Sequence, residues 1–161
     1  MTGEREREES FQAYPETVLA FEAGPRIDLR WRLDPEDRRA LTALELGPTF
    51  AVLTAEEAGD EGADDLSADA MAERQRENVR RTLRLEELLA RQSIAFRRVS
   101  SSAPDGSHRE RCVAVALARA EAMRLAAERD QVALFWYDGD RFSLWPGALE
   151  EQPEPPPSPS P

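Results

Sequence analysis

Residues 107–145, SHRERCVAVALARAEAMRLAAERDQVALFWYDGDRFSLW, form the stretch that decides the fold. An apolar and partly β-branched run at 112–117 predicts a strand. The run continues into 119–129, where Ala122, Leu125, Ala126 and Arg129 fall at the i, i+3, i+4, i+7 spacing of a helix. The pattern therefore predicts a strand that leads into an amphipathic helix.

The second half of this stretch predicts a strand and a hairpin. Residues 132–137 (VALFWY) are apolar except for the phenol, which favours a strand covered on both faces. We expect this strand to be the central one of the sheet. Asp138 and Gly139 tolerate the positive φ of a tight turn, and 141–145 alternates in character. The sheet is therefore expected to end in a hairpin.

Before position 50 the sequence predicts a second hairpin and a short helix. Residues 17–21 (TVLAF) and 27–33 have strand patterns, and the turn residues Gly24 and Pro25 lie between them. Asp34 and Pro35 then supply an N-cap and a first helical residue. We expect this helix to end at Gly47–Pro48 and to cover the sheet.

The middle of the chain predicts two strands and a long helix. The strands are expected at 50–54 (FAVLT) and 94–99, and a turn-rich loop is expected at 100–107. Between the strands, 68–92 contains no helix breaker, and a projection at 100° per residue gathers one face: Met71, Gln75, Asn78, Thr82, Leu85 and Leu89. The Asn78 amide needs partners in such a face, either a structural hydrogen bond or a ligand.

These elements predict one α+β domain at 11–149, between disordered tails at 1–10 and 150–161. The order of the core from residue 50 to residue 137 is β-α-β-β-α-β, which is typical of a two-layer, ferredoxin-like sandwich. The N-terminal hairpin with its helix and the C-terminal hairpin strand would extend this core.

The composition limits the classes of function. The formal net charge is −11, which argues against direct nucleic-acid binding and against a membrane surface. All 21 basic residues are arginine, so lysine chemistry is excluded, and the single Cys112 excludes an intramolecular disulfide. No apolar run approaches the roughly 20 residues of a membrane span. We expect a cytoplasmic protein that has no cofactor.

Polar residues give few candidates for a site. The acidic stretch 56–69 lacks the ligand spacing of a calcium loop, so we expect a solvated loop and no metal site. The only histidine, His108, precedes a strand and could act as a general base oriented by Asp105 or Glu110, although a lone surface histidine is common. No catalytic constellation is predicted.

Four motifs in order resemble a known family. They are FAVLTA at 50–55, Glu77-Asn78 followed by Arg81 and Leu85, Asp105-Gly106 followed by Glu110, and QVALFW at 131–136. Over about residues 11–145 the chain thus resembles the bacterial domain of unknown function (DUF) 3293 family. Where the family has an asparagine and a proline after Thr54-Ala55, this chain has an acidic insertion. The resemblance implies a fold and a bacterial, cytoplasmic setting, and no activity.

Two classes of function follow as hypotheses, with a third of lower weight. The first is a non-enzymatic protein-interaction or regulatory domain with an unidentified protein partner. The second is a small-ligand or hydrolytic site built on polar residues: Thr54, Glu77, Asn78, Arg81, His108 and Glu110. The third is an acidic mimic of nucleic acid.

Overall fold

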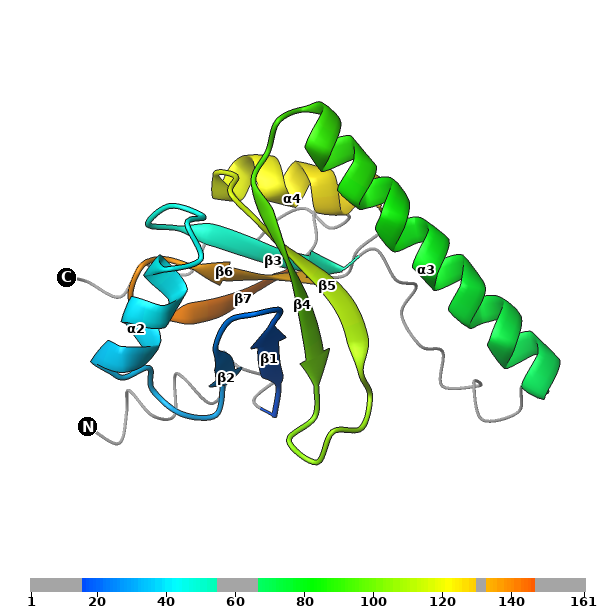
Figure 1. The fold of residues 1–161 in the computed structure, drawn as a ribbon, viewed down its shortest axis with the longest axis horizontal. Coiled ribbons are helices and arrows are strands. Elements are labelled where there is room, and N and C mark those ends of the chain that lie inside the picture. The colour runs from blue at the N-terminus through cyan, green and yellow to red at the C-terminus, as the bar shows by residue number, and fades with distance from the viewer. Residues whose placement is uncertain (1–15, 55–66, 130–132, 147–161) are drawn as a thin grey trace.

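The computed structural model describes residues 16–54, 67–129 and 133–146. Within these residues the chain forms three α-helices and a seven-stranded antiparallel sheet (Figure 1). In chain order the elements are β1 (Val18–Phe21), β2 (Arg26–Asp28), α2 (Pro35–Thr42), β3 (Phe50–Thr54), α3 (Ala68–Arg91), β4 (Phe96–Ser102), β5 (Glu110–Val115), α4 (Arg119–Glu128), β6 (Ala133–Tyr137) and β7 (Phe142–Pro146). The expected disordered tails and most of the acidic stretch lie outside the described residues.

The strands lie in the order β2-β1-β4-β5-β3-β6-β7, and every neighbouring pair is antiparallel. Both predicted hairpins, β1–β2 and β6–β7, are confirmed. The prediction that 132–137 forms the central strand is wrong, because β6 is next to last and β5 holds the middle position. An apolar run indicates that a strand is covered on both faces, and it does not indicate the position of the strand in the sheet. β6 is covered on both faces although it is not central.

The first apolar layer lies between the sheet and the helices α3 and α4. Alternate residues of the strands point into it, among them Leu53 of β3 and Val113 and Val115 of β5. Leu85 and Leu89 of α3 meet these strand residues, and all five side chains are at most 1% exposed. This layer fixes the position of α3 on the sheet.

The second apolar layer forms because the sheet curls onto itself. The rings of Phe21 in β1 and Phe50 in β3 are 6.1 Å apart, although β4 and β5 lie between their strands. In a flat sheet three strand spacings would separate them by about 14 Å. Leu41 of α2 is buried in this layer, and Arg38 of α2 pairs with Asp140 of the β6–β7 turn at 3.5 Å. Helix α2 therefore covers the curled face, as expected.

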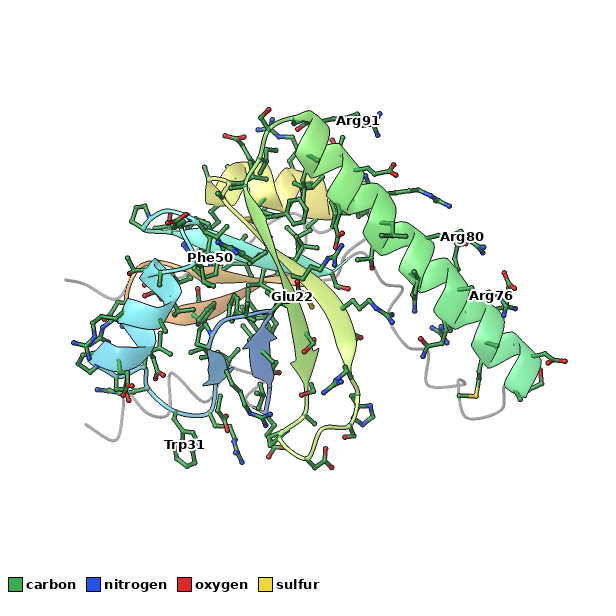
Figure 2. The ribbon with its side chains drawn as sticks, in the orientation of Figure 1. Glu22, Trp31, Phe50, Arg76, Arg80 and Arg91 are labelled. Atoms are coloured by element: carbon green, nitrogen blue, oxygen red, sulfur yellow. The ribbon has the colours of Figure 1, made fainter. Side chains whose placement is uncertain are left out.

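Several predicted element boundaries need correction. β2 is only three residues long, because the Asp28 carboxylate accepts hydrogen bonds from the backbone N–H of Arg30 (3.0 Å) and its guanidinium (2.6 Å). This turn ends the strand, and the side chain of Trp31, predicted within it, points away from the sheet (Figure 2) and is 68% exposed. β4 begins at Phe96, two residues later than predicted, and continues to Ser102, into the expected loop. The strand extends this far because its three serines pair with β1.

β5 and the helices follow their sequence signals more closely. β5 occupies 110–115 and not 112–117, because its pairing with β4 begins at Glu110. At α2 the predicted cap is confirmed: the Asp34 carboxylate accepts a hydrogen bond from the Asp37 N–H at 2.7 Å, although the helix ends at Thr42, before the predicted Gly47. α3 begins after Ser67, whose hydroxyl accepts a hydrogen bond from the Ala70 N–H.

Candidate functional site

α3 is the longest element of the described chain, and its two halves differ. Its 24 residues correspond to about 36 Å of helix. The buried residues all lie in the second half: Thr82, Leu85, Glu86 and Leu89. The first half extends past the sheet (Figure 1), and Met71 is 53% exposed although it shares the helix side of Leu85. Among the described residues, the predicted apolar face is therefore buried only in the half of α3 that packs on the sheet.

An ion pair anchors the second half to the sheet. The Glu86 carboxylate accepts hydrogen bonds from Nε (3.1 Å) and Nη2 (2.9 Å) of Arg98 in β4. The Glu86 side chain is only 10% exposed, so its charge depends on this partner. Hydrogen bonding to Glu86 raises the pKa of Arg98. One turn earlier, the Thr82 hydroxyl donates to the Asn78 carbonyl at 3.0 Å.

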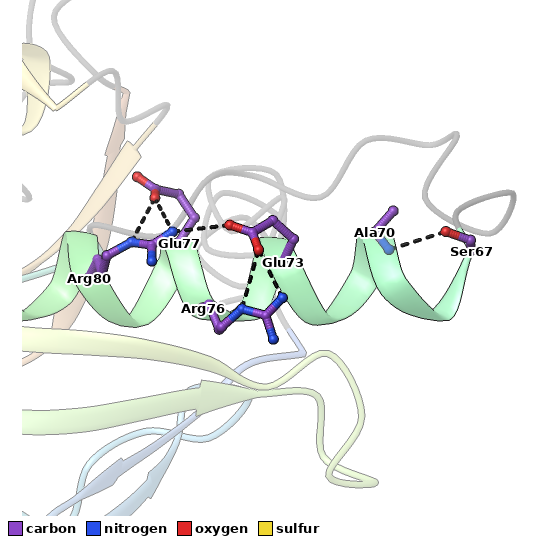
Figure 3. A network of polar contacts seen from close by, with 6 residues as sticks. All are labelled: Ser67, Ala70, Glu73, Arg76, Glu77 and Arg80. Carbon is purple, nitrogen blue, oxygen red and sulfur yellow. Dashed lines mark hydrogen bonds and ion pairs between the residues drawn. The ribbon is translucent and has the colours of Figure 1, made fainter.

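The solvent side of α3 carries a ladder of ion pairs, here called the outer ladder: Glu73, Arg76, Glu77, Arg80 and Arg84. Figure 3 shows the first four of these residues. Glu73 pairs with Arg76 at 2.8 Å and with Arg80 at 3.2 Å, and Glu77 pairs with Arg80 at 3.0 Å. Hydrogen bonds from Arg76 and then from Arg80 lower the pKa of Glu73. Exposed pairs of this kind add little to stability. They do neutralise much of the arginine charge on this side.

A second group of polar residues, here called the inner stripe, lies nearer the sheet: Arg74, Asn78 and Arg81. These residues follow one another at i, i+4 and i+7, and all three are partly buried, whereas Arg76, Arg80 and Arg84 are exposed. None of the three lacks an interaction partner. Between positions 73 and 84 five arginines face two glutamates, a local charge of +3 in a chain of net charge −11. The inner stripe contributes two of these five arginines.

The remaining candidates come from the sheet and a loop. Thr54 shares the face of Phe50 and Val52, and Glu110 shares that of Cys112, so both belong to the curled face. The Thr54 hydroxyl donates to the Arg111 carbonyl at 2.9 Å. Strand alternation places the Arg111 side chain on the opposite face, the face that α3 covers.

His108 is exposed and has a positive φ of 55° in the loop between β4 and β5. The nearby Asp105 carboxylate accepts hydrogen bonds from the Ser107 hydroxyl (2.6 Å) and N–H (2.9 Å). These bonds lower the pKa of Asp105, and the charge of His108 contributes less. Asp105 therefore serves first to shape the turn.

The six candidate residues do not form one cluster. Glu77, Asn78 and Arg81 come from the helix on one face of the sheet, Thr54 and Glu110 from the other face, and His108 from a loop. Among the described residues, no three His, Cys, Asp or Glu side chains are placed to hold a metal ion together. In the same ranges no helix is both long enough and apolar enough to cross a membrane.

Sequence reasoning missed two features of α3. Arg74 stands four residues before Asn78, so the helical spacing that singled out Asn78 could have found it. The Glu86–Arg98 pair carries no such signal, because it joins a helix to a strand across a register that the sequence does not reveal.

Comparison with known proteins gives one match. The family model described as Protein of unknown function (DUF3293) matches residues 69–134, which span α3, β4, β5, α4 and the start of β6. No curated protein and no solved structure matches the chain. Three of the four sequence motifs fall at least partly within the matched residues. Over residues 69–134, which are less than half of its length, the chain is similar to the DUF3293 family of proteins of unknown function.

Proposed function

We propose that this protein is a non-enzymatic interaction module that contacts a protein partner through the first half of α3. The observation that carries the proposal is the extension of this half past the sheet, with Met71 exposed on the side of the helix that becomes buried about three turns further on, at Thr82. An apolar side chain on a projecting, preformed helix is a common way to engage a partner.

The polar chemistry of the helix supports the same function. A hydrolytic site would need an acid, a base and a nucleophile that lie close together. The six candidate residues lie on two faces of the sheet and in a loop, which argues against such a site. By contrast, the arginines of α3 are gathered on one rigid element. Arginine next to an exposed apolar side chain is enriched at protein interfaces.

We further propose that β3, α3, β4, β5, α4 and β6 form a ferredoxin-like unit. In support, β5 lies between β3 and β4, so the crossover through α3 has the split β-α-β form. α3 and α4 also pack into the same apolar layer. An experimental structure with a different strand order would contradict this proposal.

Site-specific photocrosslinking tests the interaction function. A benzophenone amino acid replaces Met71 in the full chain, and the matched control carries it at Glu36, an exposed position of α2. In cells of the native host we expect a protein adduct from position 71 and none from position 36. The captured protein, once purified, should bind the wild-type chain and lose affinity for Met71→Glu.

Two outcomes would contradict the proposal. The first is equal adducts from both positions. The second is a small added mass in native mass spectrometry that disappears when Asn78 and Glu110 are replaced by alanine, since that result would favour a ligand site.

A further inference from the structure

The sheet has two outer edges among the described residues, and they differ in what they offer to another chain. β2 forms one edge, and it is only three residues long. Its last carbonyl, that of Asp28, already accepts a hydrogen bond from the Trp31 N–H at 3.2 Å. β7 forms the other edge with five residues, and no described strand pairs with its outer side. β7 is therefore the edge that can accept a further strand.

The register of the β6–β7 hairpin shows which backbone groups of β7 face outward. The Asp138 N–H donates to the Arg141 carbonyl at 3.1 Å, so these two residues form a hydrogen-bonded pair. Such pairs recur at every second residue of an antiparallel ladder, which turns the odd-numbered residues of β7 towards β6. Phe142 and Leu144 therefore direct their N–H and C=O groups away from the sheet. Pro146, the next residue in this phase, has no N–H, which suits the outer side of an edge strand.

The side chains of β7 alternate between the two faces of the sheet. Phe142 lies in the second apolar layer, on the curled face, and Trp145 lies in the first apolar layer, beneath the helices. Leu144 shares the face of Phe142 and is partly exposed. Residues that lie opposite each other in an antiparallel pair point to the same face. A strand added beside β7 would therefore fit best with an apolar residue opposite Leu144.

A cation lies beside the free edge. The Arg119 guanidinium, at the start of α4, stacks over the Trp145 ring at 4.0 Å from the ring centroid. The indole is fixed in turn, because its Nε1–H donates to the Ser143 hydroxyl at 2.9 Å. No carboxylate among the described residues forms an ion pair with Arg119. An acidic side chain opposite Trp145 would supply this arginine with a partner.

We infer that β7 binds an extended segment of a partner protein as an added antiparallel strand. The segment carries an acidic residue opposite Trp145 and apolar residues opposite Leu144 and Phe142. Hydrogen bonds between the main chains provide affinity in this mode of recognition, and the alternate side chains provide specificity. β7 and the first half of α3 lie well apart (Figure 1), so the inference does not rest on the proposed function.

A second copy of the chain fits this edge less well than a partner segment. In the two-fold antiparallel pairing that uses all the outward groups, Phe142 pairs with Leu144 of the other copy. This register places Arg141 of one copy opposite Trp145 of the other, and hence next to Arg119. Like charges in this position are destabilising, whereas a partner segment can supply a carboxylate. The net charge of −11 on each copy adds to the repulsion.

Peptides of defined register test the inference on the full chain. The acetylated and amidated peptide SEVTVTS has its glutamate opposite Trp145, its valines opposite Leu144 and Phe142, and its first threonine opposite Ser143. N-methylation of both valines removes the N–H groups that face β7, whereas N-methylation of the first threonine removes one that faces away. In an amide NMR titration, the valine-methylated peptide should bind at least about tenfold more weakly than the parent, and the threonine-methylated peptide within about threefold of it.

Two arginines of α4 test the acidic position. Arg119→Gln removes the cation beside β7, and the matched control Arg124→Gln removes an exposed arginine from the same helix. In the wild type and in Arg124→Gln, replacing the peptide's glutamate by glutamine should weaken binding about threefold to tenfold. In Arg119→Gln the same replacement should change the affinity by less than about twofold, because the pair is already absent. Circular dichroism checks that both variants fold.

Four results would overturn the inference. They are no binding of SEVTVTS by the wild type, equal losses from the two N-methylations, an equal effect of the glutamine replacement in the two arginine variants, and a dimer in solution that the peptide dissociates. The last would make a second copy the occupant of the edge. The photocrosslink from position 71 depends on none of them, and Met71→Glu should bind the peptide as the wild type does. The two proposals therefore fail separately.

Discussion

The two halves of α3 form one continuous helix and are held in different ways. The second half is fixed by burial of Leu85 and Leu89 and by the Glu86–Arg98 pair. The first half is held by its Ser67 cap and by the outer ladder. The same helical sequence pattern runs through both halves. The difference in burial arises because only the second half packs against the sheet. A periodic apolar face predicts a helix, but burial requires an opposing surface.

The largest expected effect comes from removing the burial of the second half. Leu85→Ala should lower the free energy of unfolding by about 2–5 kcal/mol, because it leaves a cavity beneath a fully buried side chain. Met71→Ala, on the same side of the helix, should change it by less than about 0.5 kcal/mol. Urea denaturation measures both values. Equal losses would show that the first half is buried as well.

A smaller effect is expected from the anchoring ion pair. Glu86→Gln removes the negative charge that faces Arg98, whereas Glu87→Gln changes an exposed neighbour. The free energy of unfolding should fall more for Glu86→Gln than for Glu87→Gln, and less than for Leu85→Ala. Equal losses of unfolding free energy in the two glutamine variants would mean that the Glu86–Arg98 pair does not anchor α3.

The cap at Ser67 should act locally. Ser67→Ala removes the acceptor of the Ala70 N–H, a change that typically costs a helix about 1 kcal/mol. Because the first half lies beyond the sheet, we expect faster amide hydrogen exchange before position 78 and an unchanged unfolding midpoint. A lower midpoint would show that the two halves unfold together.

The smallest effect concerns the ladder and its dependence on pH. The pKa of Glu73 lies below its ordinary 4.5, so the stabilisation from its arginine partners is present above that value and is lost as the pH falls through the lowered pKa. A carbon NMR titration of the carboxyl group should give a midpoint below 4.5 in the wild type. In Arg76→Gln/Arg80→Gln the midpoint should return towards 4.5. An unchanged midpoint would show that Arg76 and Arg80 do not lower the pKa of Glu73.

Much of the fold could be predicted from the sequence, because local signals determine its elements. The Asp34 cap predicted the start of α2, and the Asp138–Gly139 turn predicted the last hairpin. The strand order could not be predicted, since pairing between distant strands leaves no local trace. The three serines of β4 illustrate this: they favour a loop by composition, and pairing with β1 makes them a strand.

The candidate site was harder to predict. The helical projection placed Asn78 on the side of Leu85, yet it could not show that this side is buried only from Thr82 onward. The ligand-site hypothesis grouped Glu110 with residues of α3. Strand alternation places Glu110 on the curled face.

The position of β3 between β5 and β6 also bears on what the family match represents. The matched residues 69–134 supply β5 and the first two residues of β6, but these strands meet only through β3, which precedes the match. Expressed alone, that segment would leave an unpaired edge on both strands, and it would lack Ala51, Leu53 and Trp145 of the first apolar layer. The matched segment is therefore part of a folding unit, and any truncation designed to carry its function must begin upstream of Phe50.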